Sequence, residues 1–107
     1  MDDIVIGKGD LVGKGVYANR DFRKGEVVVR YNLRVLTKAE YGEFLEREKM
    51  FTHIRHGVIY LYSEPERYVN HSNSPNTYRD FSIDCDVALR DIQKGEMITT
   101  DATQEDF

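Results

Sequence analysis

The sequence predicts a small, mainly β domain with one short helix, in the α+β class. Two observations carry this prediction: a short segment that occurs twice, each time with a strand-turn-strand pattern, and a single amphipathic helix with an N-terminal capping box. The 107 residues are 40% hydrophobic and 32% charged, which is typical of a globular protein with room for one core. We therefore expect one domain over residues 1–107.

The repeated segment reads YANRDFRKGEVV from Tyr17 to Val28 and VALRDIQKGEMI from Val87 to Ile98. In each copy an apolar stretch leads to Arg-Asp, and the Lys-Gly pair that follows predicts a turn, because glycine readily adopts a positive φ. A strand is expected before each turn and another after its glutamate.

Three further stretches predict strands. The valine-rich run from residue 26 to 33 and the β-branched and aromatic run from 57 to 62 are typical of buried strands. From residue 81 to 87 apolar and polar residues alternate, as FSIDCDV, which predicts a half-buried strand.

The helix is expected over about residues 38–50. Thr37 and Glu40 have the spacing of a capping box, and Glu43 lies four residues before Arg47, an arrangement that stabilises a helix. The apolar side chains that share one face of this helix are Tyr41, Phe44 and Leu45.

The stretch from residue 63 to 78 contains both prolines and is polar, yet strands are predicted on either side of it. We expect a long ordered loop here. Long loops inside small domains often carry function.

Charge and cysteine content narrow the function classes. The net charge of -4 and the pI near 5.3 argue against nucleic acid as the main partner, because phosphate binding needs a basic face. Cationic substrates fit better, although many acidic proteins bind nothing charged. Cys85 is the single cysteine, which excludes an intramolecular disulfide and a multi-cysteine zinc cluster, and no metal is expected.

The N-terminal residues Met1 to Asp3 are acidic and precede an apolar run that ends at Gly7. This pattern predicts neither a signal peptide nor a membrane span. We therefore expect an intracellular protein, cytoplasmic or nuclear.

Three ordered motifs together resemble one family. They are GKGVYA from Gly13, RYVNHSNSPN from Arg67, and ALRDI followed by GEMITTD, which ends at Asp101. A G-x-G motif alone is a weak signal, whereas Asn-His-Ser followed by Pro-Asn is specific. In this order they resemble the SET domain, the fold of S-adenosylmethionine-dependent protein lysine methyltransferases. The resemblance implies a β-clip-like fold of small curved sheets with a C-terminal pseudoknot.

The resemblance also implies a site. The residues at the family's cofactor-binding positions, for S-adenosyl-L-methionine, are Lys14, Gly15, Arg67, Tyr68, Asn70 and His71. Glycine lets the backbone approach a ligand closely, and asparagine and histidine offer hydrogen bonds. Tyr31 stands where many SET domains have an aromatic near the substrate channel, and is the catalytic candidate. Purely structural roles remain as alternatives. Arg67 would lie on the surface, Tyr68 would belong to the core, His71 would only stabilise its loop, and Tyr31 would be an ordinary aromatic residue of a strand.

The implied reaction is the displacement of a methyl group from a sulfonium by a lysine amine. The partner it implies is a protein substrate, with a basic, lysine-containing segment. The amine must first lose a proton, which costs about 4.6 kcal/mol at pH 7, and a dry aromatic channel reduces that cost. Alignment of amine, methyl and sulfur supplies the rest, so neither a metal nor a cluster of bases is required.

The chain departs from the family at Ala102, where SET domains usually have a tyrosine after the Asp of the last motif. Either Tyr78 or Tyr31 takes its place in space, or the protein binds cofactor with little turnover. The sequence ends at Phe107 without the cysteine-rich segment that closes many SET sites. We expect a partner, a second protomer or the substrate to complete the wall, with Phe107 covering part of it.

Three other readings remain. The first is a catalytically weak or inactive SET-like module that binds cofactor or a peptide, which Ala102 favours. The second is a cysteine hydrolase that uses Cys85 and His71, although a thiol in an alternating strand is normally a core residue. The third is dinucleotide binding, which is weaker, because Gly13-Lys14-Gly15 is not continued as G-x-G-x-x-G and opens no helix.

Overall fold

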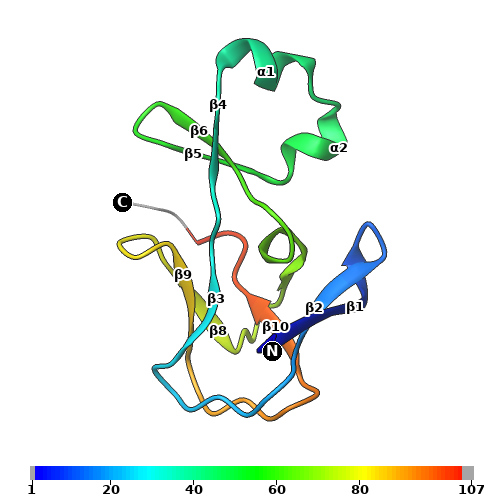
Figure 1. Ribbon diagram of the computed structural model, residues 1–107, viewed down its shortest axis with the longest axis vertical. Helices are drawn as coiled ribbons and strands as arrows, with labels where there is room; N and C mark the ends of the chain where they lie inside the picture. Colours follow the sequence, from blue (N-terminus) through cyan, green and yellow to red (C-terminus); the bar gives the residue numbers. More distant parts are fainter. Residues whose placement is uncertain (1, 105–107) are drawn as a thin grey trace.

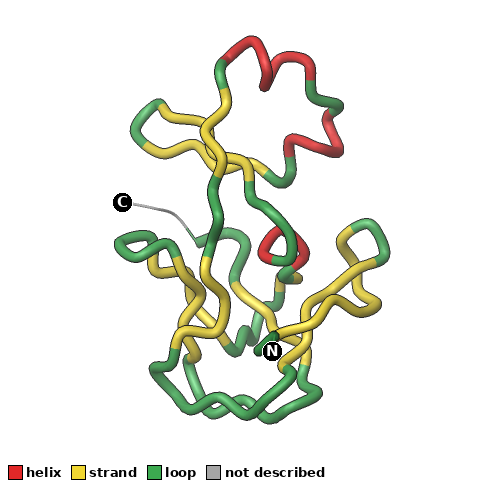
Figure 2. The backbone as a smooth tube through the Cα atoms, in the orientation of Figure 1, coloured by secondary structure: helices red, strands yellow, loops and turns green. Residues whose placement is uncertain are grey.

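The computed structural model describes residues 2–104, which form small sheets with little helix (Figures 1 and 2). The helical segments are α1 (Lys38–Glu43), α2 (Glu46–Lys49) and the 3-10 turn η1 (Glu66–Tyr68). The strands are β1 (Ile4–Leu11), β2 (Lys14–Ala18), β3 (Val27–Arg30), β4 (Arg34–Leu36), β5 (Thr52–Arg55), β6 (Val58–Leu61), β7 (Asn70–His71), β8 (Thr77–Asp80), β9 (Cys85–Ala88) and β10 (Met97–Thr100). The predicted mainly β class is confirmed.

The strands form three sheets. One has the order β1-β2-β10-β7, the second β3-β9-β8 and the third β4-β6-β5. Figure 1 shows the third sheet and both α-helices at one end of the molecule and the other two sheets at the opposite end. Within residues 2–104, no helix is long and apolar enough to cross a membrane.

The two copies of the repeated segment form the predicted strand, turn and strand. Gly25 and Gly95 have φ values of 89° and 95°, the backbone conformation for which the turns require glycine. The turns lie side by side at the lower edge of Figure 1. Phe22 and Ile92 pair in an isolated antiparallel bridge between them.

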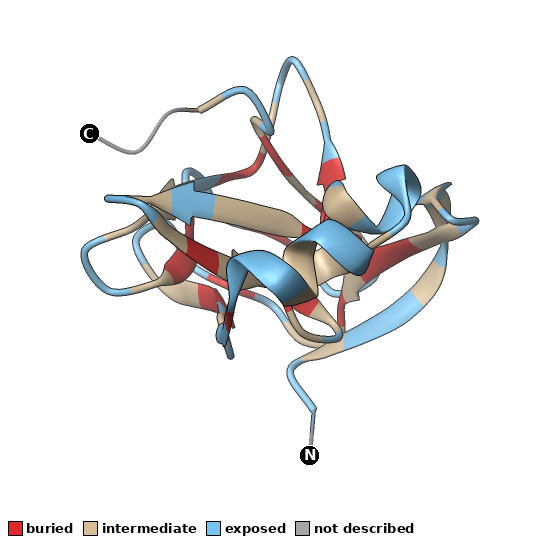
Figure 3. Cartoon of the chain, turned by 90° about the horizontal axis from the view of Figure 1, so that it is seen from above, coloured by how far each residue is buried: buried red, intermediate tan, exposed pale blue. Residues whose placement is uncertain are grey.

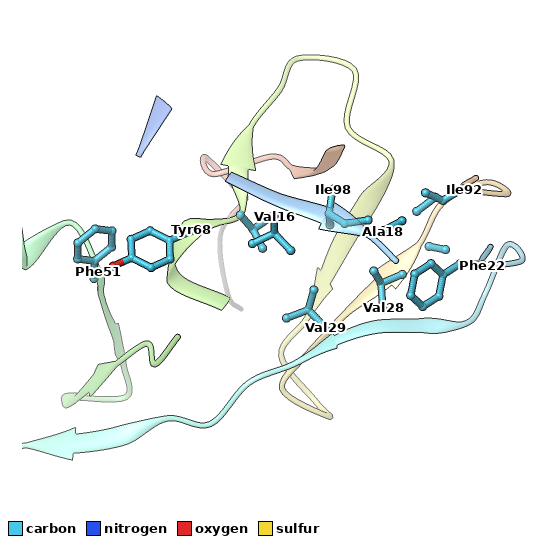
Figure 4. Close-up of a cluster of buried hydrophobic side chains, with 11 residues drawn as sticks. Val16, Ala18, Phe22, Val28, Val29, Phe51, Tyr68, Ile92 and Ile98 are labelled. Atoms are coloured by element: carbon cyan, nitrogen blue, oxygen red, sulfur yellow. The ribbon is translucent and has the colours of Figure 1, made fainter. Parts of the chain in front are cut away.

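The hydrophobic core lies between the first two sheets (Figure 4). Val16 and Ile98 are fully buried, and Phe22 and Ile92 are each 1% exposed. Phe51 extends the core cluster toward the third sheet. Its ring packs edge to face against the Tyr68 ring, with 5.8 Å between the ring centres. Figure 3 shows the helices on the exposed surface, and neither α-helix has a buried residue.

The expectation of one helix over residues 38–50 is wrong, because the chain breaks between α1 and α2. Phe44 is extended, with ψ 142°, and Leu45 likewise has ψ 151°. The carboxylate of Glu48 accepts a hydrogen bond of 2.8 Å from the Leu45 backbone N–H, which starts a second helix. Since Leu45 is 55% exposed, burial does not hold it in line with Tyr41 and Phe44. The predicted capping box of Thr37 and Glu40 is present.

The alternating stretch from 81 to 87 is not one half-buried strand. Residues 81–84 form the turn between β8 and β9, with Asp84 at φ 51° and Ile83 53% exposed. All four residues of β9, the central strand of its sheet, are buried. The alternation therefore reflects a turn followed by a central strand. Asp86, expected on the polar face, is 2% exposed.

The segment from residue 63 onward is ordered, as predicted, but it contains η1 and β7, and β8 begins at Thr77. It packs against the C-terminal strand β10. The Asn76 side chain donates to Met97 O at 2.9 Å and accepts from Thr99 N at 2.9 Å, and β7 runs parallel to β10. The loop and the C-terminal strand are thus bonded to each other, as neighbouring parts of a pseudoknot would be.

Candidate functional site

A pocket of about 370 Å³ lies where the helical end of the molecule meets the C-terminal segment. Four of the residues singled out in the sequence line it: Tyr31, Arg67, His71 and Ala102. They come from the segment after β3, from η1, from β7 and from the turn after β10. Its volume is within the range of small-molecule sites, so the fold gathers distant motifs around a usable cavity.

Lys14, Tyr68 and Asn70 do not line this pocket but form a neighbouring cluster. The Asn70 amide donates to Lys14 O at 2.9 Å and to Tyr68 O at 2.8 Å, and its oxygen accepts from Asp10 N at 2.7 Å. The Lys14 ammonium lies 4.9 Å from the centre of the Tyr68 ring. Asn70 is 3% exposed, so its side chain braces three strands or turns of the fold, and its cofactor contact stays a prediction.

Gly15 belongs to the same cluster. A Cβ at this position would lie 3.1 Å from Lys8 O, 3.1 Å from the Met97 methyl and 3.4 Å from the Asn70 amide nitrogen. A side chain here would therefore press on these neighbours, which would have to shift by a few tenths of an ångström. The predicted approach of a ligand to this backbone is a separate requirement that stays a prediction.

His71 joins the pocket to the C-terminal segment. Its Nδ1 accepts from the Ala102 backbone N–H at 3.0 Å, and its Nε2 lies 3.1 Å from Asn73 Oδ1. When Nδ1 accepts this bond, Nε2 is the ring nitrogen that donates to Asn73. The ring thus positions the backbone of Ala102, the residue at which the family's tyrosine is replaced.

Tyr31 reaches into the pocket and donates its hydroxyl hydrogen to the carboxylate of Asp86. Burial raises the pKa of Tyr31 well above its ordinary value, and the Asp86 charge raises it further. Burial also raises the pKa of Asp86 to about 6, although the Tyr31 hydrogen bond and the Arg79 charge oppose this. Tyr31 is therefore a neutral hydrogen-bond donor held by a buried acid.

Glu66 is a second buried acid in the pocket and was not identified from the sequence. One oxygen accepts from the Asn32 backbone N–H at 2.5 Å, whereas Oε2 has no hydrogen-bond partner within residues 2–104. Burial raises the pKa of Glu66 to about 7, against the lowering effect of backbone amides at Asn32 and Ser63. Its place directly before Arg67 in the RYVNHS motif was the available signal.

Tyr62 supplies the second phenol of the pocket. Its ring meets that of Tyr31 edge to face at 5.4 Å, and its hydroxyl is buried with no partner in the described part of the chain. Tyr78, proposed as a substitute for the missing phenol, is 38% exposed and does not line the pocket. Of the two suggested substitutes, Tyr31 is the one that lines the pocket, and its role in place of the missing phenol stays a prediction. Phe107 lies outside the described residues.

Two arginines, Arg67 and Arg79, line the same pocket as the acids Glu66 and Asp86 and bring positive charge to it. Arg67 donates from Nε to Tyr62 O at 3.0 Å, and its guanidinium lies 5.2 Å from the centre of the Phe51 ring. The Arg79 guanidinium lies 5.7 Å from the centre of the Tyr62 ring. Arg67 is thus a partly buried pocket residue and does not snorkel over the surface.

The geometry does not favour the hydrolase or the dinucleotide alternative. Cys85 is 1% exposed, its thiol lies 3.2 Å from Ile83 O, and burial raises the thiol pKa, which opposes the nucleophilic thiolate. His71 is engaged with Ala102 and Asn73 instead. Gly13 and Gly15 flank the start of β2, a strand, so no helix N-terminus is present there for a pyrophosphate.

Comparison with known proteins agrees with this geometry. The SET domain model matches residues 13–101, so the chain belongs to the SET-domain family. Among curated proteins, it is 34% identical over 119 aligned positions, 92% of this chain, to a variant-silencing SET domain-containing protein of Plasmodium falciparum. It is 29% identical, over 94% of this chain, to the histone-lysine N-methyltransferase trr of Drosophila melanogaster. The chain spans 5% of the length of each relative.

Solved structures show the same fold. A Plasmodium falciparum protein described as a candidate histone methyltransferase superposes with a TM-score of 0.74 at 21% identity, over 94% of this chain and 93% of the other. A polycomb repressive complex 2 structure from Chaetomium thermophilum gives a TM-score of 0.75 at 21% identity, over 94% of this chain and 15% of that one. The predicted SET fold is confirmed.

Proposed function

We propose that this chain transfers a methyl group from S-adenosyl-L-methionine to the side-chain amine of a lysine in a protein substrate. The observation that carries the proposal is the pocket, which unites Tyr31, Arg67, His71 and Ala102 in a member of the SET-domain family. One relative, which is named as a histone-lysine N-methyltransferase, supports the same chemistry. The substrate segment is basic, in keeping with the net charge of -4.

The residues present fit the cofactor. Its carboxylate needs a cation, which Arg67 at the pocket and Lys14 beside it supply. The buried hydroxyl of Tyr62 has no partner in residues 2–104 and is open to a polar ligand atom. The other residues that would hold the molecule are Gly15, Tyr68, Asn70 and His71, together with the backbone at Lys14. When bound, the cofactor supplies an electrophilic methyl group on a positively charged sulfur.

The chain's own residues orient the lysine and keep water out. Tyr31 and Tyr62 form an aromatic wall, and Tyr31 is fixed by its bond to Asp86. Such a wall favours a neutral amine over an ammonium and holds it for in-line attack, where proximity contributes several kcal/mol. Since Tyr31 keeps its proton, it acts here as a positioned donor and as part of the channel.

A second candidate function is a SET module that binds cofactor or a peptide with little turnover. The observation that favours it is Ala102, which lines the pocket at the position of the family's tyrosine and brings no hydroxyl. Both functions require cofactor or peptide binding at the same pocket. They differ in the rate of methyl transfer.

Titration with S-adenosyl-L-methionine up to millimolar concentration, followed by amide NMR, tests the proposal. We expect saturable shifts centred on Lys14, Gly15, Asn70 and His71. The matched ligand is ATP, which shares the adenosine moiety but has a triphosphate in place of the methionine, and we expect it to leave these amides unchanged. Absence of shifts with the cofactor, or equal shifts with ATP, would contradict cofactor binding by this chain.

A further inference from the structure

Glu66 lines the pocket beside Tyr31, Tyr62 and Asp86. It is 6% exposed and lines the cavity, and one of its oxygens is fixed by the Asn32 backbone N–H at 2.5 Å. Oε2 is buried without a hydrogen-bond partner in the described chain. A buried carboxylate oxygen in this state is costly unless a donor reaches it, so a ligand with an N–H group is the natural complement.

The other charged and titratable groups that line the pocket have contacts of their own, including His53, whose ring stacks on that of Phe81 at 4.8 Å. Asp86 accepts from Tyr31, Arg67 donates to Tyr62 O and packs on Phe51, and the Arg79 guanidinium lies over the Tyr62 ring. His71 is held through both ring nitrogens. Within residues 2–104, Glu66 is the acid with a fully buried carboxylate oxygen that has no hydrogen-bond partner.

We propose that Glu66 accepts, at Oε2, the proton of the lysine ammonium that enters this pocket. This inference rests on the proposed function for the identity of the substrate. In the step, the Nζ–H bond breaks, an O–H bond forms on Glu66, and the electron pair stays on nitrogen. The ammonium and the carboxylate become a neutral amine and a neutral acid, and the amine lone pair is then available for the methyl group.

The surroundings suit this transfer. Aromatic and buried walls disfavour a charged pair relative to a neutral one, so they push the proton toward the carboxylate. Burial already raises the pKa of Glu66 from 4.5 to about 7. The carboxylate is thereby a proton acceptor roughly 300-fold stronger than an ordinary glutamate. The raised pKa of Glu66 thus reduces the difference in pKa between this acid and the lysine ammonium.

The test uses n-butylammonium chloride, which reproduces the lysine side chain, and does not need the methyl donor. The protein is labelled with ¹³C at the glutamate side chains and held at about pH 8.5. This pH is above the raised pKa of Glu66, so its carboxyl group is ionised before the probe is added. The Glu66 Cδ signal is followed during titration, together with the amide spectrum. The uncharged probe n-butanol has the same chain but no proton to transfer.

We expect the Glu66 Cδ signal of the wild-type protein to move with saturation toward the protonated-acid position, with butylammonium and not with butanol. Glu66→Gln keeps an acceptor for Asn32 and is expected to weaken butylammonium binding at least tenfold. The matched variant is Glu64→Gln, two residues away, exposed and outside the pocket, and it should bind as wild type does.

A stationary Glu66 signal, or a signal that moves without approaching the protonated position, would overturn the inference. So would equal binding by wild type and Glu66→Gln. If Glu66→Gln fails to fold, the wild-type Cδ titration alone decides. Butylammonium binding at Glu66 without cofactor binding would refute the proposed function and leave this site standing.

Discussion

The carboxylate of Asp21 accepts a hydrogen bond of 2.8 Å from the backbone N–H of Lys94, in the other copy of the repeated segment. The reverse bond, from Lys24 N to Asp91, is also 2.8 Å long. Each aspartate thus holds the turn of the opposite copy. We call this pair of hydrogen bonds the reciprocal clamp. It joins the Arg-Asp pair of each copy to the Lys-Gly turn of the other and closes one end of the core.

Loss of either aspartate should therefore destabilise the fold. We expect Asp21→Ala and Asp91→Ala each to lower the free energy of unfolding by about 1–2 kcal/mol, measured by urea denaturation. Lys24→Ala is the control, because the clamp uses the backbone N–H of Lys24 and its side chain is exposed. A Lys24→Ala loss as large as that of Asp91→Ala would show that the side chain, rather than the clamp, matters.

Asn70 should be the most sensitive residue of the motif. Asn70→Asp keeps the acceptor for Asp10 N but removes both donors, to Lys14 O and Tyr68 O. Because the site is buried, we expect a loss of roughly 2–4 kcal/mol in thermal or chemical denaturation. Asn73→Ala, in the exposed part of the same loop, should cost less than about 1 kcal/mol. Similar losses for the two variants would contradict the bracing role of Asn70.

The two phenols of the pocket should respond differently to removal of their hydroxyl groups. Tyr31→Phe leaves the buried Asp86 carboxylate without its donor, and we expect a loss of about 1–3 kcal/mol. Tyr62→Phe removes a hydroxyl that has no partner within residues 2–104, so its effect should stay within about 0.5 kcal/mol. Urea denaturation at one fixed pH compares them, and an equal cost for both would argue against the Tyr31–Asp86 bond.

Stability should fall as the pH rises from about 5 to 7. The pKa of Glu66 is raised from 4.5 to about 7, and that of Asp86 from 3.8 to about 6, so the folded state holds protons that the unfolded chain has released. Stability from these acids is present below their unfolded values and is lost through the folded ones. For Glu66 the loss is on the order of 2 kcal/mol.

Denaturation curves at several pH values check this slope. Glu66→Gln does not titrate, so its stability should vary less between pH 5 and 7, whereas Glu64→Gln should follow the wild type. The acids with lowered pKa, such as Glu26 and Glu96, act in the opposite sense at more acidic pH. A wild-type stability that rises from pH 5 to 7 would contradict the buried position of Glu66.

Restoring a phenol at position 102 should raise methyl transfer. Ala102 lines the pocket and its backbone is held by His71, so the side chain of Ala102→Tyr is placed at the cavity. We expect at least about a tenfold gain in rate, a modest share of what oriented groups contribute. Thr103→Tyr adds the same phenol one residue further on, outside the pocket lining, and should give no gain. An active wild type that Ala102→Tyr leaves unchanged would show that Tyr31 or Tyr62 already serves.

The sequence by itself determined the class, the family and the two Lys-Gly turns, because these depend on local chemistry. Glycine at positive φ, a Thr-x-x-Glu cap and the Asn-His-Ser motif can be recognised without knowing what packs against them. Through the family resemblance it also named Tyr31, Arg67, His71 and Ala102, four residues that the structure gathers around one pocket.

Only the tertiary structure decided where the helix breaks, that residues 81–84 turn, and that β9 is buried on both faces. Each of these features depends on residues that are distant in sequence. For example, the Arg55 guanidinium donates a hydrogen bond of 2.8 Å to Phe81 O in the turn. The acids of the pocket show the same limit. Asp86 and Glu66 look like ordinary polar residues in the chain. Their burial in the folded protein changes their pKa values, and it leaves Oε2 of Glu66 without a hydrogen-bond partner within residues 2–104.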